Sequence, residues 1–228
     1  MTQPDTIHDT IAELEPYLVH NPKGFLPIHL ATLHRAAGST DKAHALIKGK
    51  VTTFSSQVTD KDVDKVYDGL LNFRGIFMAL GDDRNALAVL LARREYDEKT
   101  GLAILVNNAN ILVAPTKKRG TKALAFNPVC HGACLKEFTQ WDGMALCRIC
   151  EARVFCAPCF QLLKSTQRAG RPLFSCDENH GHLVVPVLTE EQRFKRGQML
   201  VDGEIMDIVD WKKELKKEWA KVQVEAAD

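Results

Sequence analysis

The seven cysteines of this chain are confined to one short segment, and this confinement constrains the fold more than any other feature. All of them lie between Cys130 and Cys176 of the 228 residues. Cysteines that only fill a core would be scattered along the chain, so the clustering indicates two unlike regions. Together with one histidine that follows shortly after Cys176, the cysteines form four closely spaced pairs. The pairs are Cys130/Cys134, Cys147/Cys150, Cys156/Cys159 and Cys176/His180.

Four pairs supply eight ligand atoms, which is the number needed to fill two tetrahedral zinc sites. In an intracellular protein, clustered thiols are more often metal ligands than disulfides. The sequence therefore predicts two structural zinc ions. Their ligands are expected to be Cys130, Cys134, Cys147, Cys150, Cys156, Cys159, Cys176 and His180. His182 follows two residues after His180 and is an alternative ligand on spacing alone.

The five residues between Cys150 and Cys156 have a natural length for a short strand. Such a strand would carry the second and third pairs to its opposite ends. This favours interleaved sites, in which the first pair joins the third and the second pair joins the fourth. Sequential pairing, with the first two pairs on one ion, is the alternative.

The region before the cysteines is expected to be helical. An amphipathic helix is predicted over residues 6–18, because apolar side chains recur there at spacings of three and four. Two later stretches, beginning at Phe25 and Leu70, each contain a helix, a glycine turn and a returning helix. Aligning Ala43 with Ala86 also aligns the turn glycines Gly38 and Gly81. A further helix is expected at residues 102–113.

This pattern of small residues at helix crossings, with a glycine before each turn, resembles the tetratricopeptide repeat. The offset of 43 residues between the aligned alanines is longer than the usual repeat of about 34. The resemblance implies elongated, irregular helical hairpins. A generic helical bundle is the alternative.

The cysteine segment resembles the ZZ-type zinc finger. Phe155 and Phe160 flank the third pair, and Gly143 lies shortly before Cys147. The first pair departs from that family because three residues separate its cysteines. The fourth pair also departs, because a cysteine precedes the histidines.

Both departures fit a narrower resemblance to a group of fungal tetratricopeptide-repeat proteins with a ZZ-like or MYND-like cross-braced zinc module. In these proteins the zinc region ends in a cysteine, three residues, a histidine and a Leu-x-Val-Pro strand. Residues 176–186 have this pattern, and Trp141 and a final helix match as well. The resemblance implies that His180 is the ligand and His182 its neighbour.

The expected fold class is therefore mostly α, with tetratricopeptide-like hairpins, plus a small α+β two-zinc module with a C-terminal helix. The expected domains are residues 1–116, a basic linker at 117–128, and the zinc module with its helix at 129–228. The final helix is predicted at residues 204–222, with an apolar stripe expected to pack on the zinc module. That stripe comprises Ile208, Trp211, Leu215 and Trp219.

Several function classes are disfavoured by the sequence. The acidic N-terminus predicts no secretory signal, and no apolar run is long enough to predict a membrane span. The net charge of +1 gives no field that attracts DNA or membranes. Thiolate-rich, closed zinc sites leave no position for a catalytic water, and the sequence contains no H-E-x-x-H, no G-x-S-x-G, no phosphate loop and no dinucleotide fingerprint. We therefore expect an intracellular protein, cytoplasmic or nuclear.

The predicted function is a non-enzymatic zinc-binding adaptor that binds a protein partner, with no role expected in binding nucleic acid or membrane. A RING-like ubiquitin-ligase module, which would recruit a ubiquitin-conjugating enzyme, is the alternative because it is also cross-braced. RING domains usually interlock their second and third pairs at a shorter spacing. The five-residue spacing here therefore favours the ZZ-like form.

Overall fold

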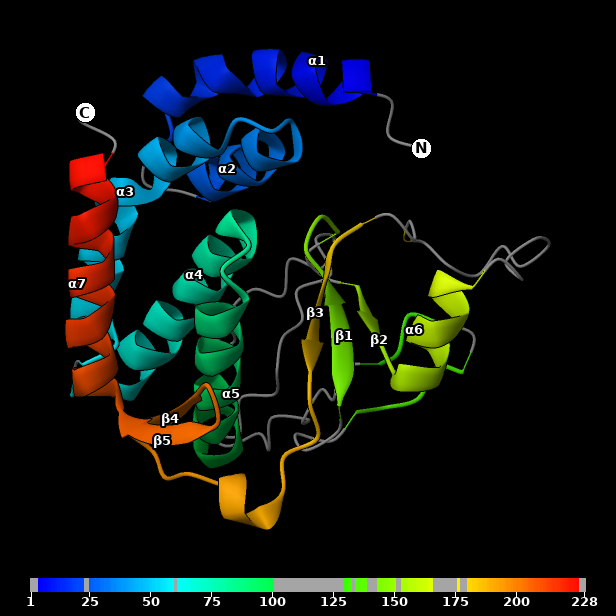
Figure 1. Cartoon of the computed structure of the whole chain (residues 1–228), viewed down its shortest axis with the longest axis vertical. Helices are drawn as coiled ribbons and strands as arrows, with labels where there is room; N and C mark the ends of the chain where they lie inside the picture. Colours follow the sequence, from blue (N-terminus) through cyan, green and yellow to red (C-terminus); the bar gives the residue numbers. More distant parts are fainter. Residues whose placement is uncertain are drawn as a thin grey trace, which may run out of the picture.

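A computed structural model describes residues 4–22, 25–59, 61–100, 129–132, 134–138, 143–150, 153–165, 176 and 180–225. Within these residues the fold is mostly helical, with two small antiparallel sheets and a C-terminal helix (Figure 1). At this level the expected fold class is confirmed. The predicted helix at 102–113, the linker at 117–128 and Trp141 lie outside the described residues.

The N-terminal region is built from consecutive helices. They are α1 (Pro4–Leu14), the 3₁₀ helix η1 (Glu15–Val19), α2 (Leu26–Ala36), α3 (Thr40–Gln57), α4 (Val63–Leu80) and α5 (Asp83–Thr100). The predicted first helix is thus α-helical only to Leu14. Pro16, near the start of η1, explains this end, because proline has no N–H to donate and its ring crowds the preceding turn.

The two hairpins α2–α3 and α4–α5 share the details that the sequence alignment predicted. Gly38 and Gly81 occupy the two turns with φ of 80° and 74°. Glycine adopts this left-handed conformation without the steric cost of a Cβ, so it is strongly favoured there. Ala43 and Ala86 are both fully buried, and each follows its turn glycine at the same spacing in the sequence.

The cysteine segment and the residues that follow it form a three-stranded antiparallel sheet in the order β2-β1-β3. Its strands are β1 (Met144–Cys147), β2 (Val154–Phe155) and β3 (His182–Val185), and α6 (Ala157–Lys164) follows β2. Strand β2 is the short strand expected between Cys150 and Cys156. The register places Cys147 opposite His182, which brings two separated parts of the cysteine segment together.

A second, two-stranded sheet was not predicted. Strands β4 (Gln198–Val201) and β5 (Glu204–Asp207) form a hairpin, so the final helix α7 begins only at Ile208 and runs to Glu225. Asp202 and Gly203 connect the strands with φ of 52° and 86°. Two consecutive positive φ values are typical of a type I′ turn, and Asp-Gly is a preferred sequence for it. This dipeptide was the sequence signal for the hairpin.

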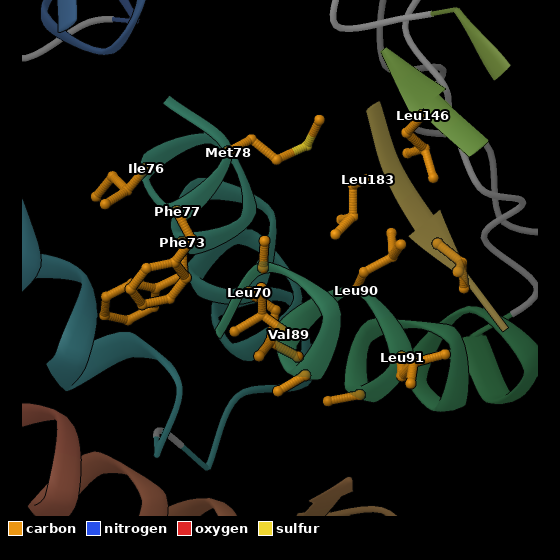
Figure 2. Packing of buried hydrophobic residues seen from close by; sticks show 14 of the residues in the cluster. Leu70, Phe73, Ile76, Phe77, Met78, Val89, Leu90, Leu91, Leu146 and Leu183 are labelled. Atoms are coloured by element: carbon orange, nitrogen blue, oxygen red, sulfur yellow. The ribbon is translucent and has the colours of Figure 1, made fainter. Parts of the chain in front are cut away.

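The helices and the three-stranded sheet share one continuous hydrophobic core. Figure 2 shows where they meet: Leu183 of β3 and Leu146 of β1 face the side on which Met78 of α4 and Leu90 of α5 lie. All four side chains are at most 5% exposed. The sheet that carries the cysteines is therefore packed on the helices and is not an isolated module.

Helix α7 packs on the N-terminal helices, and the prediction that it would pack on the zinc module is wrong. Trp211 lies edge-on to Phe73 and Phe77, with ring centroids 5.5 and 6.1 Å away. Its indole Nε1–H donates to Asn85 Oδ1 at 2.8 Å. The β4–β5 hairpin causes this placement, because it reverses the chain beside α5 (Figure 1). The predicted division into domains at 117–128 remains a prediction.

Among the described residues, none of the helices is both long and apolar enough to cross a membrane.

Candidate metal centres

The first cluster joins the first and third cysteine pairs. The sulfur atoms of Cys130, Cys134, Cys156 and Cys159 all lie within 4.8 Å of one another. Cys156 Sγ is 3.6 Å from Cys130 Sγ and 3.4 Å from Cys134 Sγ. Three of the four residues are buried, and Cys134 is exposed.

Local backbone structure positions these four sulfurs. Cys156 is the N-cap of α6 and Cys159 lies in its first turn, so the two-residue spacing places both thiols at the same helix end. The other pair lies in a reversal closed by Cys130 N–H donating to Lys136 O at 2.7 Å. The Cys156 N–H also donates to Cys130 Sγ at 3.3 Å, which connects the two pairs.

The second cluster joins the second and fourth pairs. Its members are Cys147, Cys150, Cys176 and His180, whose ligand atoms also lie within 4.8 Å of one another. His180 Nδ1 is 3.5 Å from Cys147 Sγ, 3.4 Å from Cys150 Sγ and 3.7 Å from Cys176 Sγ. Cys147 ends β1, and His180 lies just before β3. The pairing of these strands brings the two halves of the cluster together.

The separations within both clusters match a tetrahedral zinc site. Zinc–sulfur bonds of about 2.3 Å give a tetrahedron with edges of about 3.8 Å. Sulfur–sulfur distances within the clusters include values from 3.4 to 3.9 Å, and none of the seven cysteines forms a disulfide. The eight residues thus form two groups of four in the interleaved arrangement and not in the sequential one. That these residues hold zinc remains a prediction.

The ionisation of the thiols indicates that each cluster suits a cation. A hydrogen bond from Cys176 lowers the pKa of Cys147 to about 3, whereas the same bond raises the pKa of Cys176. Burial raises the pKa of Cys150 to about 11. Without a cation, one thiolate therefore suppresses ionisation of its neighbours. A dication removes this conflict, because it stabilises all of the thiolates together.

In the first cluster, too, the pKa values of neighbouring thiols are shifted in opposite directions. Burial raises the pKa of Cys130 to about 12. The Lys136 backbone N–H, which donates to Cys134 Sγ at 3.4 Å, holds the pKa of Cys134 at about 7. Metal binding must displace the remaining thiol protons, so we expect the metal affinity of both clusters to fall at acidic pH.

His182 lies beside the second cluster without belonging to it. Its Nε2 is 3.5 Å from Cys176 Sγ, while its ring contacts Phe155 and Phe160 at centroid distances of 6.0 and 5.0 Å. The geometry favours His180 as the fourth ligand, because His180 approaches all three sulfurs. His182 is placed to donate an N–H to the Cys176 thiolate, which is a usual role for residues around a metal site.

Arg148 is a site residue that the sequence did not reveal. It lies between the ligand cysteines Cys147 and Cys150, yet it is only 8% exposed. Its guanidinium forms an ion pair with Asp83 at the start of α5, and its backbone N–H donates to Gly181 O at 2.9 Å. The Arg148–Asp83 ion pair thus connects the loop of the second cluster to helix α5. The position of an arginine between two cysteines gives no sequence signal that would predict its pairing with Asp83.

Comparisons with protein-family models, with curated proteins and with solved structures found no match for this chain. The interpretation of the two clusters therefore depends on their own residues and geometry.

Substitution of the two histidines should separate their roles. We expect His180→Ala to reduce the zinc content from two ions to about one per chain, because it removes the fourth ligand of the second cluster. His182→Ala should retain both ions and weaken the affinity of one of them about 10- to 100-fold. Zinc measured by mass spectrometry and by competition with a chelator tests both statements. The reverse ranking of the two variants would assign the ligand to His182.

Proposed function

We propose that this protein is a non-enzymatic, intracellular zinc-binding adaptor whose two metal ions are structural. The observation that carries the proposal is the presence of two four-membered ligand clusters, one with four sulfurs and one with three sulfurs and a nitrogen. Sites of this composition are saturated by protein ligands and leave no position for a catalytic water. The metal then contributes to folding and not to a reaction.

The location of the clusters supports a structural role for zinc. Strand β2 has only two residues and α6 only eight, which are too short to be stable alone. Two of the three strands end beside cluster residues, and α6 begins at one. Zinc bound at these points would hold the ends of these short strands and of α6 in place and so contribute to their stability.

We further propose that the helical region is of the tetratricopeptide type and belongs with the fungal repeat proteins that it resembles. Support comes from the two hairpins with matched turn glycines and matched buried alanines at positions 38, 81, 43 and 86. Repeat proteins of this kind commonly use their extended surfaces to bind other proteins. An adaptor for a protein partner is the function that unites the helices with the structural metal centres.

Metal analysis tests the first part of the proposal. We expect the purified full-length protein to contain two zinc ions per chain and to release them as the pH falls, because protons compete for the thiolates. A zinc content well below two, with thiols that react freely in the native protein, would refute the structural metal centres. Zinc release measured with a colorimetric indicator between neutral and acidic pH gives the pH dependence.

Affinity capture tests the adaptor role. The zinc-loaded chain should retain a specific protein, and a matched sample stripped of metal should lose it. Failure of the zinc-loaded protein to capture any partner above background would argue against an adaptor.

A RING-like ligase remains the second candidate, because the interleaved grouping is also the arrangement of RING domains. Ubiquitylation assayed with a panel of conjugating enzymes distinguishes the two. Chain formation that depends on intact clusters would favour the ligase, and its absence across the panel would favour the adaptor.

A further inference from the structure

The two clusters differ in how far their cysteines are shielded from solvent. The structure describes all seven cysteines, and Cys134 of the first cluster is the one that is exposed. It begins an exposed stretch, residues 134–137, in which Leu135 is 69% exposed and has a φ of 50°. In the second cluster the most accessible cysteine, Cys150, is half-buried, and the other two are buried. A small reagent dissolved in water therefore reaches the first cluster more readily than the second.

The exposed cysteine lies beside a buried cysteine of the same cluster. Cys134 Sγ is 3.4 Å from Cys156 Sγ, although 22 residues separate the two along the chain. A disulfide bond is about 2 Å long, so a small movement of the exposed stretch would bring these two sulfurs to bonding distance. The first cluster thus combines an accessible thiol with a second thiol that can trap its oxidised form.

The chemistry of a zinc–thiolate site directs oxidation to its sulfur atoms. Zinc has no redox chemistry of its own, so an oxidant that reaches the site reacts with a ligand. The thiolate is the form of cysteine that peroxides oxidise, and its susceptibility follows its exposure. A sulfenic acid formed in this way condenses with a neighbouring thiol to give a disulfide. Among the ligands of both clusters, Cys134 best meets these conditions.

We propose that Cys134 is a modification site for hydrogen peroxide and that Cys156 completes the reaction as a disulfide with it. The Cys134 thiolate attacks one peroxide oxygen, so that an S–O bond forms and the O–O bond breaks. The second oxygen takes up a proton and leaves as water. The Cys156 thiolate then attacks the Cys134 sulfur, so that the S–S bond forms, the S–O bond breaks and a second water leaves. The two sulfurs together lose two electrons, which the peroxide gains.

This modification would empty the first cluster and leave the second intact. The disulfide leaves only Cys130 and Cys159 as thiolates, and a structural zinc ion needs four ligands. Cys156 is also the N-cap of α6, so loss of the ion would loosen the start of that helix. This inference rests on the structural zinc proposed above, and it makes the first metal centre the point at which an oxidant would control the adaptor.

The experiment uses the full-length, zinc-loaded protein, whose zinc content is measured before any oxidant is added. Hydrogen peroxide is then added, zinc release is followed with a colorimetric indicator, and disulfides are mapped by peptide mass spectrometry. We expect one zinc ion per chain to leave at least about tenfold faster than the other, together with a Cys134–Cys156 disulfide. A phosphine reductant and added zinc should restore both ions.

Cys134→His separates oxidation from metal binding. Histidine is a zinc ligand that cannot form a disulfide, and three sulfurs with one nitrogen is the ligand set of the second cluster. We expect this variant to bind two zinc ions and to release the first at least about tenfold more slowly in peroxide. Leu135→Asn is the matched control, because it changes the adjacent exposed residue, removes no ligand and tolerates a positive φ. It should release zinc as the wild type does.

A wild-type measurement decides the matter if Cys134→His fails to bind zinc. Iodoacetamide added to the zinc-loaded protein should alkylate Cys134 before Cys150 or any other cysteine. Alkylation in another order, equal release of both ions, or a disulfide that does not join Cys134 to Cys156 would overturn the proposal. So would a zinc-loaded Cys134→His that responds to peroxide as fast as the wild type. A zinc content well below two before oxidation would instead contradict the structural metal centres.

Discussion

Replacing Cys156 by serine is expected to lower the free energy of unfolding by at least about 4 kcal/mol. Cys156 Sγ lies 3.6 and 3.4 Å from two other sulfurs of the first cluster, so its loss would leave the zinc ion proposed there with three ligands. Structural zinc contributes binding energy directly to folding. Chemical denaturation monitored by circular dichroism, together with zinc analysis, measures the effect. The zinc content should fall from two to about one.

Ala157→Ser is the matched control for this substitution. It introduces a serine at the adjacent exposed position, at the start of α6, without removing a ligand. We expect its stability to stay within about 0.5 kcal/mol of the wild type. If Cys156→Ser retained both zinc ions and normal stability, the first cluster would not be a structural metal centre.

The effect of Cys156→Ser should extend beyond the sheet. Leu183 of β3 and Leu90 of α5 belong to the same buried core, so loosening the sheet exposes one side of the helices (Figure 2). We therefore expect the helical signal and the zinc centres to be lost in overlapping transitions. If the helices of Cys156→Ser unfolded at the same denaturant concentration as those of the wild type, the sheet would not contribute to the stability of the helices.

Trp211→Ala is expected to destabilise the protein by about 3–5 kcal/mol. The indole is 1% exposed and contacts two phenylalanine rings of α4, so its removal leaves a large cavity. It also leaves Asn85 Oδ1 buried without the donor it had at 2.8 Å. Denaturant titration followed by circular dichroism measures the change and avoids dependence on tryptophan fluorescence.

Trp211→Phe separates the two contributions. Phenylalanine keeps most of the ring packing but cannot donate to Asn85, so we expect a loss of about 1–3 kcal/mol. Both variants should retain two zinc ions, because Trp211 belongs to neither cluster. A change in stability no larger than that of an exposed substitution would contradict the packing of α7 on α4 and α5.

Most of the helices and turns of this protein could be predicted from its sequence. Period-3.6 apolar patterns predicted the helices, and Gly38 and Gly81 predicted the turns, because glycine adopts positive φ without the steric cost of a Cβ. The five-residue spacing between Cys150 and Cys156 predicted β2 and the interleaved grouping of the ligands. The Asp202-Gly203 turn carried an equally local signal, which was assigned to the start of a helix instead of a hairpin.

The cysteine spacings identified all seven cysteines as candidate ligands, because pairs separated by two or three residues place their thiols at the same turn, and they left His180 and His182 as alternatives for the eighth ligand. Only the tertiary structure decided what these clusters and α7 pack against. Trp211 lies on Phe73 and Phe77, and Arg148 reaches Asp83, across 65 or more residues of sequence. Such contacts depend on how complementary buried surfaces meet, and no periodic pattern along the chain encodes the partner of a given face.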